Sequence, residues 1–237
     1  MLRAVFLDFG NTLVDESIFI PAANMGVVDF VRLRAGLSEP RDVLYRKLQA
    51  TPDGAPADDP RRQEPRTREV LRVDTFLRFA AGCGLALGPA DVAGMMAAYD
   101  SAAAASGLIS GTIEALRRLR TRYRMAIMSN GYAGFVHSTL ARHDLRRYFD
   151  AVCISQEVNT EKPGRAFYGR GADALGVRPE EVLMVGDRWE ADVAGAKRLG
   201  MATCWINPER LSPPDPAMCD FTVSRLAELP CLLAERD

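Results

Sequence analysis

Short apolar runs recur along the chain at residues 4–7, 124–128, 151–154, 182–185 and 202–206. Their near-continuous apolar character is typical of parallel strands that are buried on both faces of a sheet. From residue 109 onward, segments with apolar positions at helical spacing separate these runs. Strands that alternate with helices indicate an α/β fold with a parallel sheet and right-handed crossovers. A short helix is expected at the end of the chain, near residues 224–233.

The stretch between the first two predicted strands follows a different pattern. No strand interrupts it, and its apolar positions recur at helical spacing over residues 18–33, 43–48, 70–80 and 89–105. Residues 51–66 are rich in proline, aspartate and arginine and lack periodicity, which predicts an exposed loop. We therefore expect a small helical bundle that is inserted into the α/β chain.

Composition and charge narrow the class of protein further. The chain is 48% hydrophobic and 26% charged, which is ordinary for a globular protein, and its net charge of −1 argues against a nucleic-acid or polybasic membrane partner. The five cysteines are scattered without C-x-x-C spacing and are expected to be reduced thiols. No apolar run approaches the roughly 18 residues that span a membrane, and no signal peptide is apparent. These features predict a cytoplasmic protein, and they leave open whether it is a monomer or a homodimer.

Polar residues that could carry chemistry follow the predicted strands, at Asp8, Ser129, Asn130, Lys162, Asp187 and Asp192. Ligand sites of open parallel sheets lie at the carboxyl ends of the strands, so we expect these side chains to meet. Carboxylate oxygens suit Mg²⁺, which is held by one or two carboxylates together with waters and substrate phosphate oxygens. A carboxylate beside Mg²⁺ and a lysine can attack phosphorus, while Lys162 and Ser129 would steady the phosphoryl oxygens.

Four motifs in order extend this pattern over essentially the whole chain. They are Asp-Phe-Gly-Asn-Thr-Leu at residues 8–13, Ser-Asn-Gly at 129–131, Glu-Lys-Pro at 161–163 and the run Val-Gly-Asp-Arg-Trp-Glu-Ala-Asp at 185–192, continued to residue 201. With these motifs the chain resembles hydrolases of the haloacid dehalogenase superfamily. The resemblance is to the branch of subfamily I whose helical cap, of the C1 type, lies between the first two motifs.

The resemblance implies a domain organisation and a set of roles. It implies a Rossmann-like catalytic core at residues 1–15 and 110–237 and a helical cap at residues 16–109. It implies a phosphatase that acts on a small phosphorylated substrate with Mg²⁺. The implied catalytic residues are Asp8, as nucleophile, and Lys162. The implied phosphate contacts are Ser129, Asn130 and Lys162, and the implied metal ligands are Asp8, the backbone carbonyl of Gly10, Asp187 and Asp192.

One position departs from the pattern of the phosphatases in this superfamily. They carry a second aspartate two residues after the nucleophile, which protonates the leaving alcohol and then activates water; this chain has Gly10. A general acid or base typically contributes about 10²- to 10⁴-fold, so a slow phosphatase is expected unless another group substitutes. Asp15 or Glu16, in the segment between core and cap, could substitute, and an acyl phosphate would need little protonation.

Gly10 also keeps other functions open. The chain could be a phosphate-ligand-binding or regulatory protein that has lost turnover. Dehalogenase chemistry, which dispenses with Mg²⁺, is opposed by the intact Asp187 and Asp192. Phosphonoacetaldehyde hydrolases carry a small residue at this position and use a cap lysine as a Schiff base. Lys47 would be that lysine, although its helical context equally predicts a solvent-facing side chain.

Overall fold

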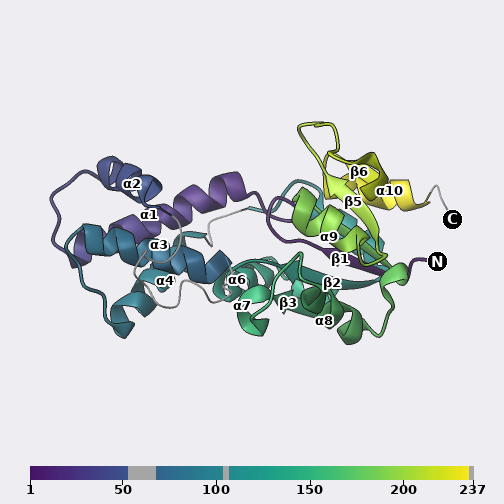
Figure 1. The fold of residues 1–237 in the computed structure, drawn as a ribbon, viewed down its shortest axis with the longest axis horizontal. Coiled ribbons are helices and arrows are strands. Elements are labelled where there is room, and N and C mark those ends of the chain that lie inside the picture. The colour runs from purple at the N-terminus through teal and green to yellow at the C-terminus, as the bar shows by residue number, and fades with distance from the viewer. Residues whose placement is uncertain (53–67, 104–106, 235–237) are drawn as a thin grey trace. The chain divides into compact units, whose positions relative to one another are not determined.

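The computed structural model describes residues 1–52, 68–103 and 107–234. The chain divides into two compact units, one made of Met1–Asp15 and Gly107–Asp237 and the other of Glu16–Ser106. The first unit contains the sheet and the second contains helices (Figure 1).

The sheet of the first unit has six strands in the order β3-β2-β1-β4-β5-β6, and all of its pairings are parallel. The strands are β1 (Ala4–Leu7), β2 (Arg124–Ser129), β3 (Ala151–Ile154), β4 (Val182–Gly186), β5 (Ala202–Ile206) and β6 (Phe221–Val223). The predicted α/β class with a parallel sheet is confirmed. The edge strand β6 was not predicted, because it has three residues and only Val223 is fully buried.

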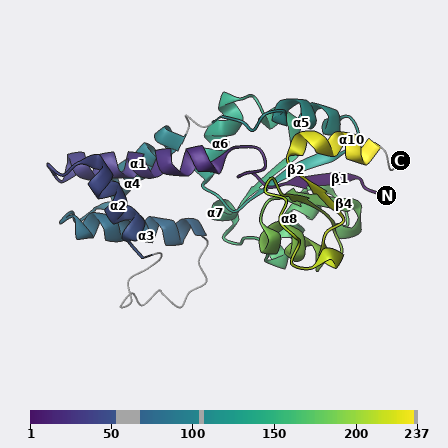
Figure 2. The same cartoon turned by 90° about the horizontal axis from the view of Figure 1, so that it is seen from above.

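Helices cover both faces of this sheet. They are α5 (Thr112–Arg120), α6 (Ala133–Arg142), α7 (Ser155–Val158), α8 (Arg165–Leu175), α9 (Gly195–Lys197) and α10 (Leu229–Ala234). Alternate strand residues such as Phe6, Met128 and Met184 form one core cluster with α8. In Figure 2, α5 and α10 lie on the opposite side of the sheet from α8. Two covered faces explain why the central strands are almost wholly apolar.

The chain leaves β1 in a tight turn that ends the strand at Asp8. The N–H of Leu13 donates to the carbonyl of Phe9 at 2.9 Å, and the N–H of Asn11 donates to the carbonyl of Val14 at 2.7 Å. Asn11 has a φ of 48°, in the left-handed region that asparagine tolerates better than most residues. The turn therefore holds Asp8 and Asn11 at the carboxyl edge of the sheet.

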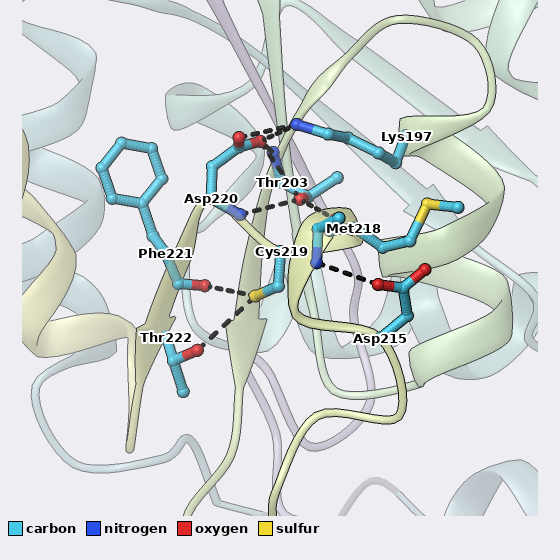
Figure 3. A network of polar contacts seen from close by, with 9 residues as sticks. Lys197, Thr203, Asp215, Met218, Cys219, Asp220, Phe221 and Thr222 are labelled. Carbon is cyan, nitrogen blue, oxygen red and sulfur yellow. Dashed lines mark hydrogen bonds and ion pairs between the residues drawn. The ribbon is translucent and has the colours of Figure 1, made fainter.

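A polar network attaches β6 and the loop before it to the rest of the core (Figure 3). The Lys197 ammonium contacts both carboxylate oxygens of Asp220, at 2.6 and 2.7 Å. The same carboxylate accepts a 2.9 Å hydrogen bond from the N–H of Thr203 in β5. The hydroxyl of Thr203 donates to the carbonyl of Met218 at 2.7 Å. These bonds tie α9, β5 and the edge of the sheet together.

The second unit contains α1 (Glu16–Arg34), α2 (Arg41–Ala50), α3 (Arg68–Gly82) and α4 (Pro89–Ala103). Tyr99 of α4 is buried against Phe19 and Phe76, with ring centroids 5.9 and 5.6 Å away. Its hydroxyl accepts a 2.9 Å hydrogen bond from Arg72. The predicted loop at 51–66 lies largely outside the described residues, as does the end of the helix predicted over residues 89–105. None of the described helices is long and apolar enough to cross a membrane.

Candidate active site

Four of the predicted site residues meet at the carboxyl edge of the sheet. Asp8 directly follows β1, and Asp187 directly follows β4, the neighbouring strand. Asp192 lies in the one-turn π-helix Trp189–Ala194, and Lys162 lies in the turn before α8. Carboxylate oxygens of Asp8, Asp187 and Asp192 lie within 4.8 Å of one another.

Lys162 joins two of these carboxylates. Its side chain is 1% exposed, and its Nζ donates to Oδ1 of Asp8 at 2.6 Å and to Oδ1 of Asp192 at 2.7 Å. Burial lowers the pKa of Lys162, but the carboxylates of Asp192 and Asp8 outweigh burial and hold the pKa above its ordinary value. The ammonium is therefore charged at neutral pH and fixes the Asp8 carboxylate in one orientation.

The position of Asp192 depends on a glycine in the preceding strand. A Cβ on Gly186 would lie 2.3 Å from Cγ of Asp192, closer than any real contact, so only glycine lets the fully buried carboxylate rest on the end of β4. The N–H of Arg188 donates to its Oδ2 at 3.0 Å. Burial raises the pKa of Asp192, while Lys162 and this N–H oppose the rise. Between β4 and β5 the structure has the π-helix followed by α9 and not one continuous α-helix, and single π-helical turns are frequent at functional sites.

Asp187 is held by two residues that the sequence reasoning did not single out. Asn11 donates from Nδ2 to Oδ2 of Asp187 at 3.2 Å. Trp205, in β5, donates from Nε1 to the carbonyl oxygen of Asp187 at 2.9 Å, and its ring packs edge-on against Trp189 with centroids 5.0 Å apart. The sequence signal for this contact was the position of Trp205 near the end of the strand that neighbours β4.

The three carboxylates fit a divalent cation that prefers oxygen ligands. At an Mg–O distance of about 2.1 Å, two ligands on opposite sides of the ion lie about 4.2 Å apart, so oxygens within 4.8 Å need only small movements. When all four groups are ionised, the three carboxylates and the Lys162 ammonium carry two net negative charges, which a divalent cation would balance. The donor set and the charge both suit Mg²⁺, and Asp8, Asp187 and Asp192 would hold it.

Ser129 and Asn130 lie at the end of β2, next to β1. Ser129 is 4% exposed, and a Cβ on Gly131 would lie 2.8 Å from its Oγ, so the Ser-Asn-Gly order leaves space for this hydroxyl. The amide of Asn130 forms two hydrogen bonds with the main chain of Lys162. The predicted phosphate contacts of both residues stay predictions.

Gly10 lies in the turn after β1 and is half-buried, where its backbone pairs with Val14. Asp15 ends the first segment of the sheet unit, and Glu16 begins the helical unit. The predicted substitution of Asp15 or Glu16 for a general acid therefore stays a prediction.

Lys47 does not have the environment of a Schiff-base lysine. Its side chain is 50% exposed, and its Nζ contacts both carboxylate oxygens of Glu39 at 2.8 and 2.9 Å. The hydrogen bond to Glu39 raises the pKa of Lys47, whereas a Schiff base requires a neutral amine. The solvent-facing alternative is the one the structure supports.

Residues 2–200 match the model of the haloacid dehalogenase-like hydrolases, and the chain belongs to this family of hydrolases. It is 35% identical over 129 residues to pyrimidine 5'-nucleotidase YjjG of Escherichia coli, a match that covers 54% of this chain and 57% of that protein. It is 28% identical over 210 residues to the glyceraldehyde 3-phosphate phosphatase of Methanothermobacter thermautotrophicus, covering 88% and 87%.

Solved structures have the same fold. A crystal structure of a HAD phosphatase from Thermococcus onnurineus superposes with a TM-score of 0.67 at 26% identity and covers 98% of both chains. A 2-haloacid dehalogenase from Pseudomonas syringae superposes with a TM-score of 0.78 at 20% identity and covers 100% of both chains. The fold is thus shared by phosphatases and dehalogenases, and the site must distinguish between their activities.

Proposed function

We propose that this hydrolase is a Mg²⁺-dependent phosphatase of a small phosphorylated metabolite and works through a phosphorylated Asp8. The observation that carries the proposal is the buried cluster in which Lys162 contacts Asp8 and Asp192 while Asp187 lies within 4.8 Å. Relatives named as phosphatases and as a nucleotidase support the same class of substrate.

In the first step, an Oδ atom of Asp8 attacks phosphorus and the bond to the leaving oxygen breaks, with its electron pair departing on that oxygen. Lys162 orients the Asp8 carboxylate and offsets negative charge on the phosphoryl group, and the Ser129 hydroxyl can donate to a phosphoryl oxygen. Mg²⁺, when bound, would supply charge neutralisation and a template for the phosphate. Water then cleaves the aspartyl-phosphate at phosphorus, which regenerates Asp8 and releases phosphate.

Gly10 makes both steps slow for substrates whose leaving group departs as an alkoxide. The three carboxylates of the cluster are engaged as nucleophile or as candidate metal ligands, so none is assigned to protonate a leaving group or to activate water. Loss of such a group costs about 10²- to 10⁴-fold in rate. Substrates with acidic leaving groups, such as acyl phosphates, do not need the leaving group to be protonated and so avoid the loss in the first step.

A second candidate function is the binding of a phosphorylated ligand without turnover. Gly10 favours it, because the residue that would complete hydrolysis is absent. The buried Lys162 opposes it: an ammonium held between two carboxylates is costly to bury, and binding alone does not need the Asp8 carboxylate fixed as a nucleophile.

Trapping the intermediate tests the proposal. The protein is incubated with acetyl phosphate and Mg²⁺, quenched in acid, and examined by peptide mass spectrometry for one phosphoryl group on Asp8. We expect the phosphopeptide in the wild type and its absence without Mg²⁺ or in the Asp8→Asn variant. Binding of the phosphate ligand with no phosphopeptide would favour the second candidate.

A further inference from the structure

Asn130 holds the main chain of Lys162 at two points. Its Nδ2 donates to the carbonyl oxygen of Lys162 at 2.8 Å, and its Oδ1 accepts from the N–H of Lys162 at 2.9 Å. The two residues are 32 positions apart in the chain. The amide plane of one side chain thus pairs with the donor and the acceptor of a single residue.

Lys162 needs such an anchor because no regular element fixes its backbone. It lies between the end of α7 at Val158 and the start of α8 at Arg165, outside the helix and sheet ladders. Asn130, by contrast, directly follows β2, which pairs with β1 and therefore shares the sheet edge with Asp8. The two hydrogen bonds transfer the rigidity of the sheet to the loop that carries the lysine.

The position of the Lys162 main chain decides where its ammonium lies. The side chain has four rotatable bonds and must bring Nζ to 2.6 Å from Asp8 and 2.7 Å from Asp192. Displacements of about 1 Å at a catalytic group can cost about 10²-fold in rate. A fixed backbone limits such displacement.

We propose that Asn130 is a positioning residue that sets the place of Lys162 beside Asp8, a role distinct from the phosphate contact predicted for it. The consequence for turnover rests on the function proposed above for Lys162, whereas the consequence for the position of Lys162 does not.

The chain offers a matched control in Asn207, at the end of β5. Its Nδ2 donates to the carbonyl oxygen of Leu211 at 2.8 Å, and its Oδ1 accepts from the N–H of Leu211 at 3.0 Å. This is the same two-point clamp in the same unit, but it holds a loop without a site lysine. The variants Asn130→Ala and Asn207→Ala therefore remove equal numbers of hydrogen bonds.

Acylation of lysines reports the position of Lys162 independently of activity. The chain has three lysines, and acetic anhydride labelling followed by peptide mass spectrometry measures each one. Lys162 is 1% exposed and Lys197 is 28% exposed, so Lys197 serves as the internal reference. We expect Asn130→Ala to raise the Lys162-to-Lys197 labelling ratio about tenfold or more, and Asn207→Ala to leave it within about twofold.

Kinetics with p-nitrophenyl phosphate supply the second readout. We expect kcat to fall about 100-fold in Asn130→Ala with KM nearly unchanged, and to stay within a few-fold of wild type in Asn207→Ala. If Asn130→Ala does not fold, Asn130→Asp replaces it, because aspartate keeps the acceptor for the Lys162 N–H and loses the donor. For this variant the labelling ratio should rise to a smaller extent.

An unchanged labelling ratio in the folded Asn130 variant, or an equal rise in Asn207→Ala, overturns the proposal. If the wild type shows no phosphate release that depends on Asp8, the proposed function fails, and the labelling ratio alone decides the role of Asn130.

Discussion

Replacement of Gly10 by aspartate should convert a slow phosphatase into a faster one. Gly10 lies two residues after Asp8 and is half-buried in the turn that follows β1. Gly10 is not among the described glycines with positive φ, so its backbone conformation does not require a glycine. In the phosphatases that the chain resembles, the carboxyl group at this position protonates the leaving oxygen.

The size of the gain follows from the chemistry that Gly10 lacks. A positioned general acid contributes about 10²- to 10⁴-fold, which corresponds to about 2.7 to 5.4 kcal/mol of barrier at 1.36 kcal/mol per tenfold. This gain applies to leaving groups that depart as strongly basic alkoxides. An acyl phosphate releases a carboxylate with a pKa near 4, which needs no proton at neutral pH, so its gain should be close to none.

The assay compares kcat/KM for glycerol phosphate, phenyl phosphate and acetyl phosphate, because kcat/KM reports the transfer of the phosphoryl group to Asp8. Gly10→Asn is the matched control, since it has almost the same size without an acidic proton. We expect the gain in Gly10→Asp to decrease in the order alkyl, aryl, acyl. Equal rates in the two variants, or a gain that ignores the leaving group, would refute the missing-acid explanation.

Three other outcomes follow from the structure. Gly186→Ala should lower kcat at least about 100-fold and lower the stability measured by thermal unfolding by about 1–3 kcal/mol, because its Cβ would displace Asp192. Gly169→Ala in α8 is the control: its Cβ would meet no atom within 4 Å, so this variant should be more stable by about 0.5–1 kcal/mol. Mg²⁺ at 100 times its Kd should raise the free energy of unfolding by about 2.7 kcal/mol, as measured by calorimetry. The same stabilisation by Mg²⁺ in Asp187→Asn would contradict the metal site. Lys47→Gln should leave kcat within about twofold, and a large loss would restore the Schiff-base alternative.

The parts of the site that lie at strand ends could be predicted from the sequence. Asp8 and Asp187 each follow a buried apolar run, and the carboxyl ends of neighbouring parallel strands always lie at the same edge of the sheet. The sheet itself was predictable for the same reason, because burial on both faces leaves a continuous apolar signal in the central strands.

The supporting contacts could not be predicted in this way. Asn130 binds the main chain of Lys162, and every residue except proline offers the same N–H and C=O groups. The sequence therefore cannot show which residue an asparagine side chain binds in this way. The π-helix that carries Asp192 depends on tertiary packing, as does the role of Gly186, which appears only when the distance to Asp192 is known. Strand β6 was missed because three residues at a sheet edge carry too little pattern.

The most direct test of the central claim is phosphate release in Mg²⁺ from a panel of phosphomonoesters, acyl phosphates and phosphonoacetaldehyde. The Asp8→Asn variant, checked for a wild-type melting profile, is the blank. We predict release that disappears in the blank and without Mg²⁺, and that is fastest for acidic leaving groups. Release equal to that of the blank across the whole panel would contradict the assignment of Asp8 as a phosphatase nucleophile.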